Sequence, residues 1–213
     1  MILYLSIIGV SVVILSVINI ALGCNVWGLN EWWTIAVLLG CVVYEFAIDG
    51  FFAWALHELP DKWFSRNKKI YKVGKKERKF YDFLKIKKWK DKVWELGGLG
   101  GFRKNKIADP NNPKYLEQFI VESNKGVAIH ITGIIIGFSL IFVVPIKFVW
   151  TISLPVCIVN TMLNLMSTFV LRYNIPKLEV ALERARRNAE KEAKQLKEKM
   201  FEFLEEDSKE NVG

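Results

Sequence analysis

Two pairs of polar residues stand at equal spacings around the last two apolar segments of the sequence. Glu122 and His130 are eight residues apart, and so are Asn164 and Arg172. Ionisable and amide groups are costly inside an apolar segment, so each is a functional candidate. Histidine is the natural general base near neutral pH, and an amide can orient that base or donate to an oxyanion. The set indicates proton-transfer chemistry at the edge of an apolar segment.

The spacing predicts which of these side chains meet. On one helix, eight residues correspond to about 12 Å of rise and about 80° of rotation, so Glu122 and His130 cannot touch. An antiparallel hairpin folded about Lys147 places residue n level with residue 294 − n. We therefore expect a Glu122–Arg172 layer at the cytoplasmic surface and a His130–Asn164 layer deeper in. Either layer could instead serve only to hold the helices together.

A second acidic pair, Glu45 and Asp49, lies in an earlier apolar segment. Its spacing of four residues places both carboxyl groups on one helix face. They could bind a cation or a polar headgroup of an acceptor. Otherwise they form a protonated pair bonded to Ser or Asn of the first apolar segment, or lie at a shallow depth. His57 follows at the cytoplasmic end of the same segment, and Asp61 comes just after it.

The elements that carry these residues are apolar blocks. They cover residues 1–23, 32–56, 126–146 and 148–171, and the charged residues lie almost entirely between and after them. Blocks of this length predict an all-α integral membrane protein with four transmembrane helices. The first block could also be a signal peptide, but it lacks a basic start and a clear cleavage site. Pro145 and Lys147 are expected in the turn between the last two blocks.

The distribution of basic residues predicts the orientation. Residues 57–125 hold nineteen Lys and Arg against nine Asp and Glu, whereas the connection between the first two blocks has none of the basic type. The positive-inside rule then predicts a multi-pass protein of the cell membrane with both termini in the cytoplasm. The net charge of +8 favours anionic lipid headgroups or an anionic co-substrate, and we expect no nucleic acid.

The segment before the third block predicts an interfacial structure. Residues 79–97 read as a basic helix with Phe80, Phe83, Leu84, Val93 and Trp94 on its apolar side, which suits the membrane surface or the cytoplasmic face of the protein itself. The glycine cluster at residues 97–106 could present backbone N–H groups to phosphate or form a flexible turn; it lacks the P-loop spacing. The three cysteines have no metal-ligand spacing, so no metal is expected.

The chain therefore divides into four parts. Residues 1–57 are expected to form two transmembrane helices, 58–125 a basic interfacial segment, 126–172 a transmembrane hairpin and 173–213 an amphipathic charged helix. Leucine and alanine recur every three or four residues in the last part, with i, i+4 pairs of opposite charge. This helix could pack on the cytoplasmic segment or make a homo-oligomer as a short coiled coil.

Several short motifs resemble one family. They are LPDKWF (59–64), KIKKWKD (85–91), FIVESNKGVAIH (119–130) and LRYNIPKL (171–178), with Asn164 ahead of the last. In order and spacing they are similar to the glycosyl-4,4'-diaponeurosporenoate acyltransferases, small membrane enzymes understood to esterify the sugar of a carotenoid glycoside with a fatty acyl chain. The chain departs from the family pattern at Lys125, Val127 and Ile131, and at Ile175 and Lys177. The matching positions are Asp61, Trp89, Glu122, His130, Asn164, Arg172, Tyr173 and Asn174.

The resemblance, taken together with the placement of the other polar residues, indicates a candidate site. His130, Glu122 and Asn164 are the catalytic candidates. The candidates for binding an anionic donor are Arg172, Tyr173, Asn174 and Lys125. The candidates for binding the acceptor are Glu45, Asp49, His57 and Asp61. The expected reaction moves a fatty acyl group from acyl-CoA or a similar cytoplasmic thioester to a hydroxyl of a lipid or glycolipid, with no covalently bound cofactor. The alternatives are a non-catalytic lipid-binding or assembly protein, and another small membrane transferase or reductase.

Overall fold

The computed structural model describes residues 2–26, 30–93 and 107–210, and all regular structure in these ranges is helical. The long helices are α1 (Ile2–Val26), α2 (Glu31–His57), α5 (Pro113–Gly137) and α7 (Leu154–Glu210). The short helices are η1 (Asp61–Phe64), η2 (Lys69–Tyr71), α3 (Lys75–Phe83), α4 (Ile86–Trp89), η3 (Lys90–Lys92), α6 (Leu140–Val143), η5 (Ile146–Phe148) and the π-helical turn η6 (Val149–Ser153).

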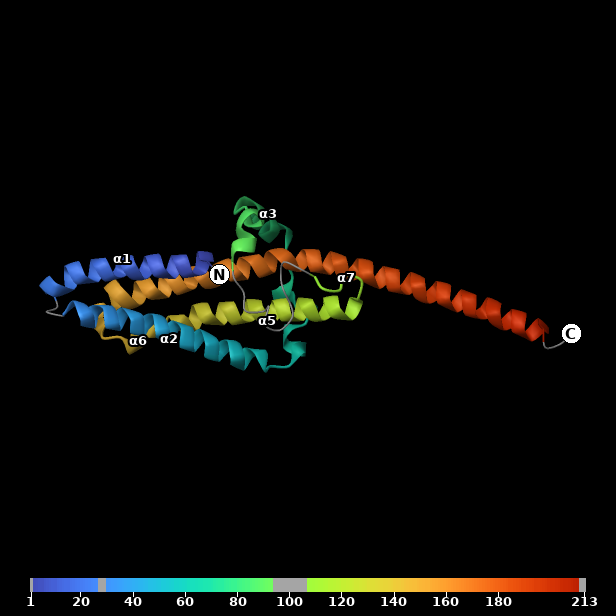
Figure 1. Cartoon of the computed structure of the whole chain (residues 1–213), viewed down its shortest axis with the longest axis horizontal. Coiled ribbons are helices and arrows are strands. Elements are labelled where there is room, and N and C mark those ends of the chain that lie inside the picture. Colours follow the sequence, from blue (N-terminus) through green and yellow to red (C-terminus); the bar gives the residue numbers. More distant parts are fainter. Residues whose placement is uncertain (1, 27–29, 94–106, 211–213) are drawn as a thin grey trace.

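Four helical segments of the described chain are long and apolar enough to cross a membrane, as the sequence predicts. They belong to α1, α2, α5 with α6, and the first part of α7. Figure 1 shows these segments side by side, with the direction of the chain alternating from one to the next. The end of α1, the start of α2 and the hairpin turn at residues 144–148 therefore lie at one end of the bundle, and the start of α1 and α3 lie toward the other.

Capping residues and prolines set the helix ends. Asn30 caps α2 by accepting a hydrogen bond from the backbone N–H of Trp32 at 2.8 Å, and Asn112 caps α5 in the same way, directly before Pro113. The helix α2 ends at His57, shortly before Pro60. The hairpin between α5 and α7 turns at residues 144–148, where the sequence places it.

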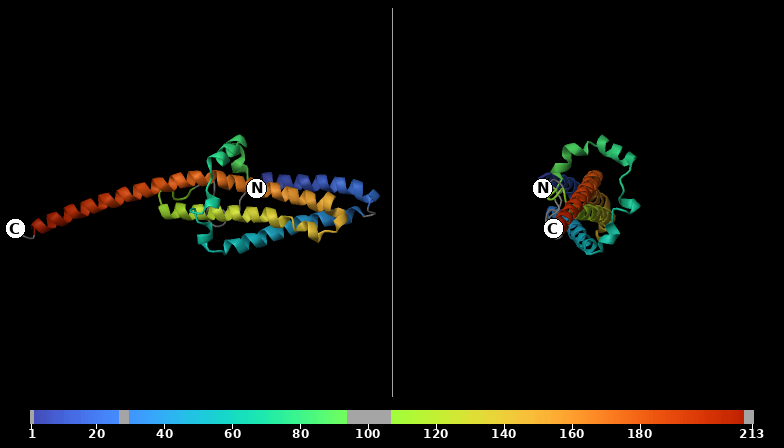
Figure 2. Two further views of the ribbon diagram at one scale, coloured as in Figure 1. Left: turned by 180° about the vertical axis from the view of Figure 1, so that it is seen from behind. Right: turned by 90° about the vertical axis from the view of Figure 1, so that its right-hand side faces the viewer.

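The last helix is longer than expected, because α7 continues through Pro176 instead of starting again after it. Apolar contacts hold the helix on both sides of the proline. Leu171 and Ile175 pack on Val127 of α5, and Leu178 and Leu182 pack on Leu116 and Ile120. This packing offsets the backbone hydrogen bond that proline removes. Beyond these contacts α7 projects from the bundle as a single exposed helix (Figures 1 and 2).

The helix predicted over residues 79–97 is interrupted. The helix α3 ends at Phe83, and Lys85 adopts a left-handed conformation with a φ of 52° before α4 begins. The break lets Tyr81 and Ile86 both pack against Val170 of α7, while Phe83 remains 79% exposed. The segment thus packs on the protein's own surface and still presents an aromatic side chain outward. Trp94 and the glycine cluster at 97–106 lie outside the described residues.

Candidate functional site

The helices α5 and α7 pair in the register that the sequence predicts. His130 Nδ1 lies 2.8 Å from Asn164 Oδ1, and the Sγ of Cys157 donates to the backbone oxygen of Gly137 at 3.4 Å. Both pairs of residue numbers sum to 294, so the two helices lie level along this stretch. The expected His130–Asn164 layer is confirmed.

The acidic pair of α2 meets two asparagines of α7. Asn160 Nδ2 donates to Glu45 Oε2 at 2.9 Å, and Asn164 Nδ2 donates to Asp49 Oδ2 at 3.1 Å. The residue numbers in both pairs differ by 115. The difference is the same because α2 and α7 run in the same direction and each carries its two polar residues four positions apart. The partners of the acidic pair are therefore asparagines of the fourth apolar segment and not Ser or Asn of the first.

Two glycines of α5 make room for this polar chain. A Cβ atom on Gly133 would lie 2.8 Å from Asp49 Oδ1 and 3.2 Å from the amide of Asn164. A Cβ on Gly137 would lie 2.6 Å from Asn160 Nδ2 and 2.8 Å from Glu45 Oε2. Neither space accepts a side chain, so the close approach of three helices depends on both glycines.

The hydrogen bonds of Asn164 determine which nitrogen of His130 carries the proton. Its Nδ2 donates to Asp49 Oδ2 and to Asn160 Oδ1, the latter at 3.0 Å, and both of these are acceptors. The Oδ1 of Asn164 therefore faces His130 as an acceptor, and His130 Nδ1–H donates to it. This tautomer places the basic lone pair of His130 on Nε2, where a general base needs it.

A second polar cluster lies where α2 ends and η1 begins. The buried Nζ of Lys125 lies 2.7 Å from Asp61 Oδ1 and 3.4 Å from Glu122 Oε1. Gln118 donates to both carboxylates, and His57 Nδ1 lies 3.9 Å from Glu122 Oε2. The hydrogen bond from Lys125 is the main cause that lowers the pKa of Asp61, so Asp61 is held as a carboxylate. Four of the predicted site residues thus meet in one cluster.

The expected Glu122–Arg172 layer is wrong. Arg172 binds both carboxylate oxygens of Glu77 in α3, with Nη2–Oε2 at 2.9 Å, and donates to the backbone oxygens of Ile70 and Lys72. The two predicted partners lie level, but eight residues of helix turn each of them about 80° away from the seam between α5 and α7. Matching heights alone do not make a contact.

The ion pair with Arg172 affects the pKa of Glu77. Burial by itself would raise the pKa of Glu77, but hydrogen bonds from Arg172 and Tyr81, together with the charge of Arg172, outweigh it, so the pKa lies below its usual value. Arg172 thus holds α3 against α7, and it does not line the cavity described next.

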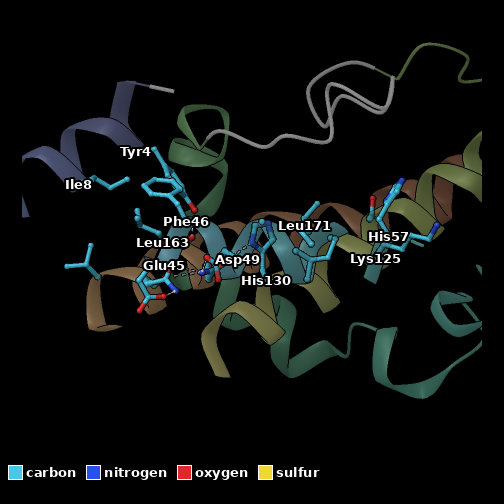
Figure 3. Close-up of a pocket in the computed structure, with 18 of the residues that line it drawn as sticks. Tyr4, Ile8, Glu45, Phe46, Asp49, His57, Lys125, His130, Leu163 and Leu171 are labelled. Atoms are coloured by element: carbon cyan, nitrogen blue, oxygen red, sulfur yellow. Dashed lines mark hydrogen bonds between the residues drawn. The ribbon is translucent and has the colours of Figure 1, made fainter. Parts of the chain in front are cut away.

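One large cavity connects the two polar clusters. It has a volume of about 970 Å³ and is lined by α1, α2, α5 and α7, together with Lys90 of η3 and Ile107. Its lining on α7 extends from Val156 to Leu178, a length of about 33 Å at the rise of an α-helix. Figure 3 shows His130 between the acidic pair of α2 and the end marked by His57 and Lys125. The histidine thus lies partway along an elongated cavity that has one polar end and one largely apolar end.

The remaining predicted residues take different places. Asn174 lines the cavity, and its buried Nδ2 makes no hydrogen bond within the described chain. Tyr173 packs in the cluster around Val170 and lies under the Nζ of Lys177, at 3.8 Å from the ring centroid. Lys177 itself also lines the cavity. No group of three or more His, Cys, Asp or Glu in the described ranges is arranged to hold a metal ion.

The sequence analysis did not predict two residues that form hydrogen bonds with predicted site residues, Asn160 and Glu77. Asn160 completes the chain from Asn164 to Glu45, and the equal i, i+4 spacing of the two pairs is a signal that could have found it. Glu77 lies in the basic interfacial segment, and nothing in its local sequence marks it as the partner of Arg172.

The fold and site together define a small helical membrane protein with a histidine–amide–carboxylate chain bordering an interior cavity. Residues 60–184 match the family described as glycosyl-4,4'-diaponeurosporenoate acyltransferase, so the chain belongs to that family. This membership makes the chain an acyltransferase, of a family that acts in carotenoid glycoside synthesis. No curated protein and no solved structure matches the chain.

Proposed function

We propose that the protein transfers a fatty acyl group from a cytoplasmic thioester, acyl-CoA or a similar donor, to a hydroxyl of a glycosylated or lipid acceptor. The observation that carries the proposal is the hydrogen bond of 2.8 Å between His130 and Asn164 beside the cavity. It fixes the tautomer of the histidine, and the cavity that His130 lines gives both substrates room to meet beside its imidazole.

The reaction needs one base and no covalent intermediate. His130 Nε2 takes the proton of the acceptor hydroxyl while the oxygen attacks the thioester carbonyl. The new C–O bond forms, the C–S bond breaks, and the imidazolium returns the proton to the thiolate that leaves. The products are an ester and a free thiol, so atoms and charge balance. Asn164 and Asp49 act as positioning residues, since they hold the imidazole through its Nδ1.

The ends of the cavity suit the two parts of a thioester donor. Lys90, Lys125 and Lys177 line the region that opens toward the basic segment, and such charges attract an anionic head group. Asn174 offers its buried amide hydrogens in the same region. Lys125 is held in a buried cluster by two carboxylates, whereas Lys90 pairs with one exposed carboxylate, Asp91, at 3.5 Å, and Lys177 lies over the neutral ring of Tyr173. We therefore assign the larger share of head-group binding to Lys90 and Lys177.

The proposed orientation places residues 58–125 and both termini in the cytoplasm. It is supported by the basic residues between α2 and α5 and by the alternating direction of the four apolar segments. A soluble thioester would then reach the polar end of the cavity directly, while the acceptor enters from the lipid phase.

The test is transfer by purified protein in detergent or nanodiscs. Palmitoyl-CoA is the donor and glycosyl-4,4'-diaponeurosporenoate is the acceptor, and both ester formation and thiol release are measured. We expect His130→Ala to lower kcat by about 10²- to 10⁴-fold, the usual contribution of a general base. Ile131→Ala is the control, because Ile131 is the adjacent residue of α5, is 41% exposed and does not line the cavity. Equal turnover by wild type and His130→Ala would refute the assignment of the base.

A further inference from the structure

The first helix makes hydrogen bonds at two levels, to α7 near its start and to the π-helical turn η6 near its end. Near its start, the hydroxyl of Tyr4 donates to the backbone oxygen of Leu163 at 2.8 Å and lies 3.2 Å from Ser167 Oγ. Near its end, the fully buried Asn19 donates to the backbone oxygen of Thr151 at 2.7 Å. These contacts are fifteen residues apart, or about 22 Å along the helix. They hold the intervening turns of α1 beside the segment that η6 and the first turns of α7 form.

Between these two contacts α1 has one face toward the cavity and one away from it. The inward face lines the cavity with Ile8, Ser11, Val12 and Leu15. Across from it the cavity is lined by Leu38, Val42 and Phe46 of α2 and by Val156, Val159 and Leu163 of α7. The opposite face of α1 is exposed, with Val13 at 62% and Val17 at 63%. The helix is therefore the wall of an apolar arm of the cavity.

The arm has a closed end. Leu38, Leu140, Phe148 and Ile152 form a buried cluster beneath the hairpin turn, and Val12 and Leu15 pack against it. From the level of Asn164 to that of Val156 the arm is eight residues deep, or about 12 Å. Glu45 and Asp49 border it, and each directs one oxygen toward α7 through its hydrogen bond to Asn160 or Asn164, while Asp49 Oδ1 lies buried beside Gly133 of α5. A chain entering from His130 would therefore meet apolar side chains and then a packed wall.

We propose that this arm binds the fatty acyl chain of the donor and that the inward face of α1 sets the chain length that fits. The inference rests on the proposed thioester donor. Such a donor is linear, with an anionic head, then the reactive carbonyl, then a hydrocarbon chain. The cavity follows the same order, with lysines at one end, His130 partway along and the apolar arm beyond. The walls of the arm on α1 and α2 lie outside residues 60–184 and are not covered by the family match, whereas the wall on α7 lies within it.

The first experiment compares two identical substitutions on adjacent residues of α1. Val12→Trp fills the arm, whereas Val13→Trp adds the same bulk on the exposed face. Octanoyl-, dodecanoyl-, palmitoyl- and stearoyl-CoA are compared with a fixed acceptor. We expect Val12→Trp to lower the ratio of kcat/KM for palmitoyl- over octanoyl-CoA by about ten-fold or more, because each buried methylene lost costs about a factor of four. Val13→Trp should keep the wild-type ratio.

Three results would overturn the proposal. One is an unchanged chain-length profile in an active Val12→Trp protein, and another is an equal shift in Val13→Trp. The third is a change in the preferred alkyl chain length of the acceptor, measured by comparing octyl and dodecyl glucoside at a fixed donor. That result would assign the arm to the acceptor. If Val12→Trp does not fold, Leu15→Ala gives the opposite test, since a deeper arm should favour stearoyl-CoA.

A second experiment separates this inference from the proposed chemistry. Palmitoyl-CoA carrying a diazirine at the end of its chain is photolysed with wild type and with His130→Ala. We expect labels on α1 residues 8–15 in both proteins, competed by unlabelled palmitoyl-CoA. Labelling of α1 without any transfer by the wild type would refute the proposed function alone. Labels elsewhere in a protein that does transfer acyl groups would refute the arm.

Discussion

The guanidinium of Arg172 is shared between one carboxylate and two backbone oxygens, so its charge serves to hold α3 in place. Glu77 accepts two hydrogen bonds from it and a third from Tyr81. Both partners are largely shielded, with side-chain exposures of 15% for Arg172 and 26% for Glu77. A hydrogen-bonded pair in such surroundings contributes more than a surface ion pair. Its contribution depends on the charge of Glu77, and hence on pH.

We predict that Glu77→Gln removes an acid-sensitive part of the stability. The folded-state pKa of Glu77 is lowered from its usual 4.5. The pair therefore stabilises the fold fully above that value, and the contribution is lost as the pH falls through the lowered pKa. At neutral pH the variant should unfold about 2–8 °C below wild type, for a loss of about 1–2 kcal/mol. The two melting curves should converge in acid.

Thermal unfolding in detergent across a pH series measures this effect. Asp82→Asn is the matched control, because it also neutralises a carboxylate of α3, but at an exposed position. A constant difference between wild type and Glu77→Gln at every pH would contradict the ion-pair explanation, and so would an equal loss in the control.

At the scale of residues, the sequence predicts contacts across the hairpin and misses those that come from outside it. The pairing of His130 with Asn164 follows from the position of the turn and the helical rise. The partner of Arg172 does not, because Glu77 is 95 positions away in a segment whose path is set by packing. The position of a residue along a helix axis follows from its residue number. The direction of its side chain also depends on the angular position of the residue around that axis.

Among the elements, α5 is the helix whose small residues decide how closely its neighbours approach. Gly133 lies against Asp49 and Asn164, and Gly126 lies against Leu171. The two glycines face equally short contacts of 2.8 Å for an added Cβ, but those contacts differ in kind. One is with hydrogen-bonded polar groups of the candidate site, and the other is with the end of a leucine side chain that can rotate.

We predict that Gly133→Ala lowers activity much more than Gly126→Ala does. Alanine favours the helix equally at both positions, so propensity cancels in the comparison. A methyl at Gly133 must displace Asn164 and with it the imidazole of His130, and misplacing a catalytic group by about 1 Å can cost up to about 100-fold in rate. Acyl transfer by both variants, at matched melting temperatures, measures the effect. Equal activity in the two proteins would show that the polar chain does not position the base.

At the scale of elements, the sequence predicts the long apolar helices well because each is defined by its own composition. It fails at Pro176 and at Lys85 for the same reason. Contacts with other helices carry α7 through a proline, and they break the basic helix at a residue with no local signal. Packing between elements decides both cases, and a single sequence does not display it.

The whole molecule separates charge from apolar surface along its length. The described part of the basic segment and the charged part of α7 lie toward one end of the bundle, and the end of α1, the start of α2 and the hairpin turn lie at the other (Figure 2). Lys147 is the only basic residue in the hairpin turn at residues 144–148. The positive-inside rule predicts that the connections face outward and that the basic end faces the cytoplasm, which is the orientation proposed above. The access of a cytoplasmic donor to the cavity depends on this orientation.

We predict that a membrane-impermeant maleimide distinguishes these two ends in cells. In a background with Cys24, Cys41 and Cys157 replaced by serine, single cysteines are introduced as Lys147→Cys, Lys87→Cys and Gln195→Cys, all at exposed positions. Intact protoplasts should label only the Lys147→Cys protein, and the other two should react only after permeabilisation. Labelling of Lys87→Cys in intact protoplasts would place the lysine-lined end of the cavity outside. A cytoplasmic thioester could then not reach His130 from that end, and the proposed donor would have to be abandoned even if the histidine is the base.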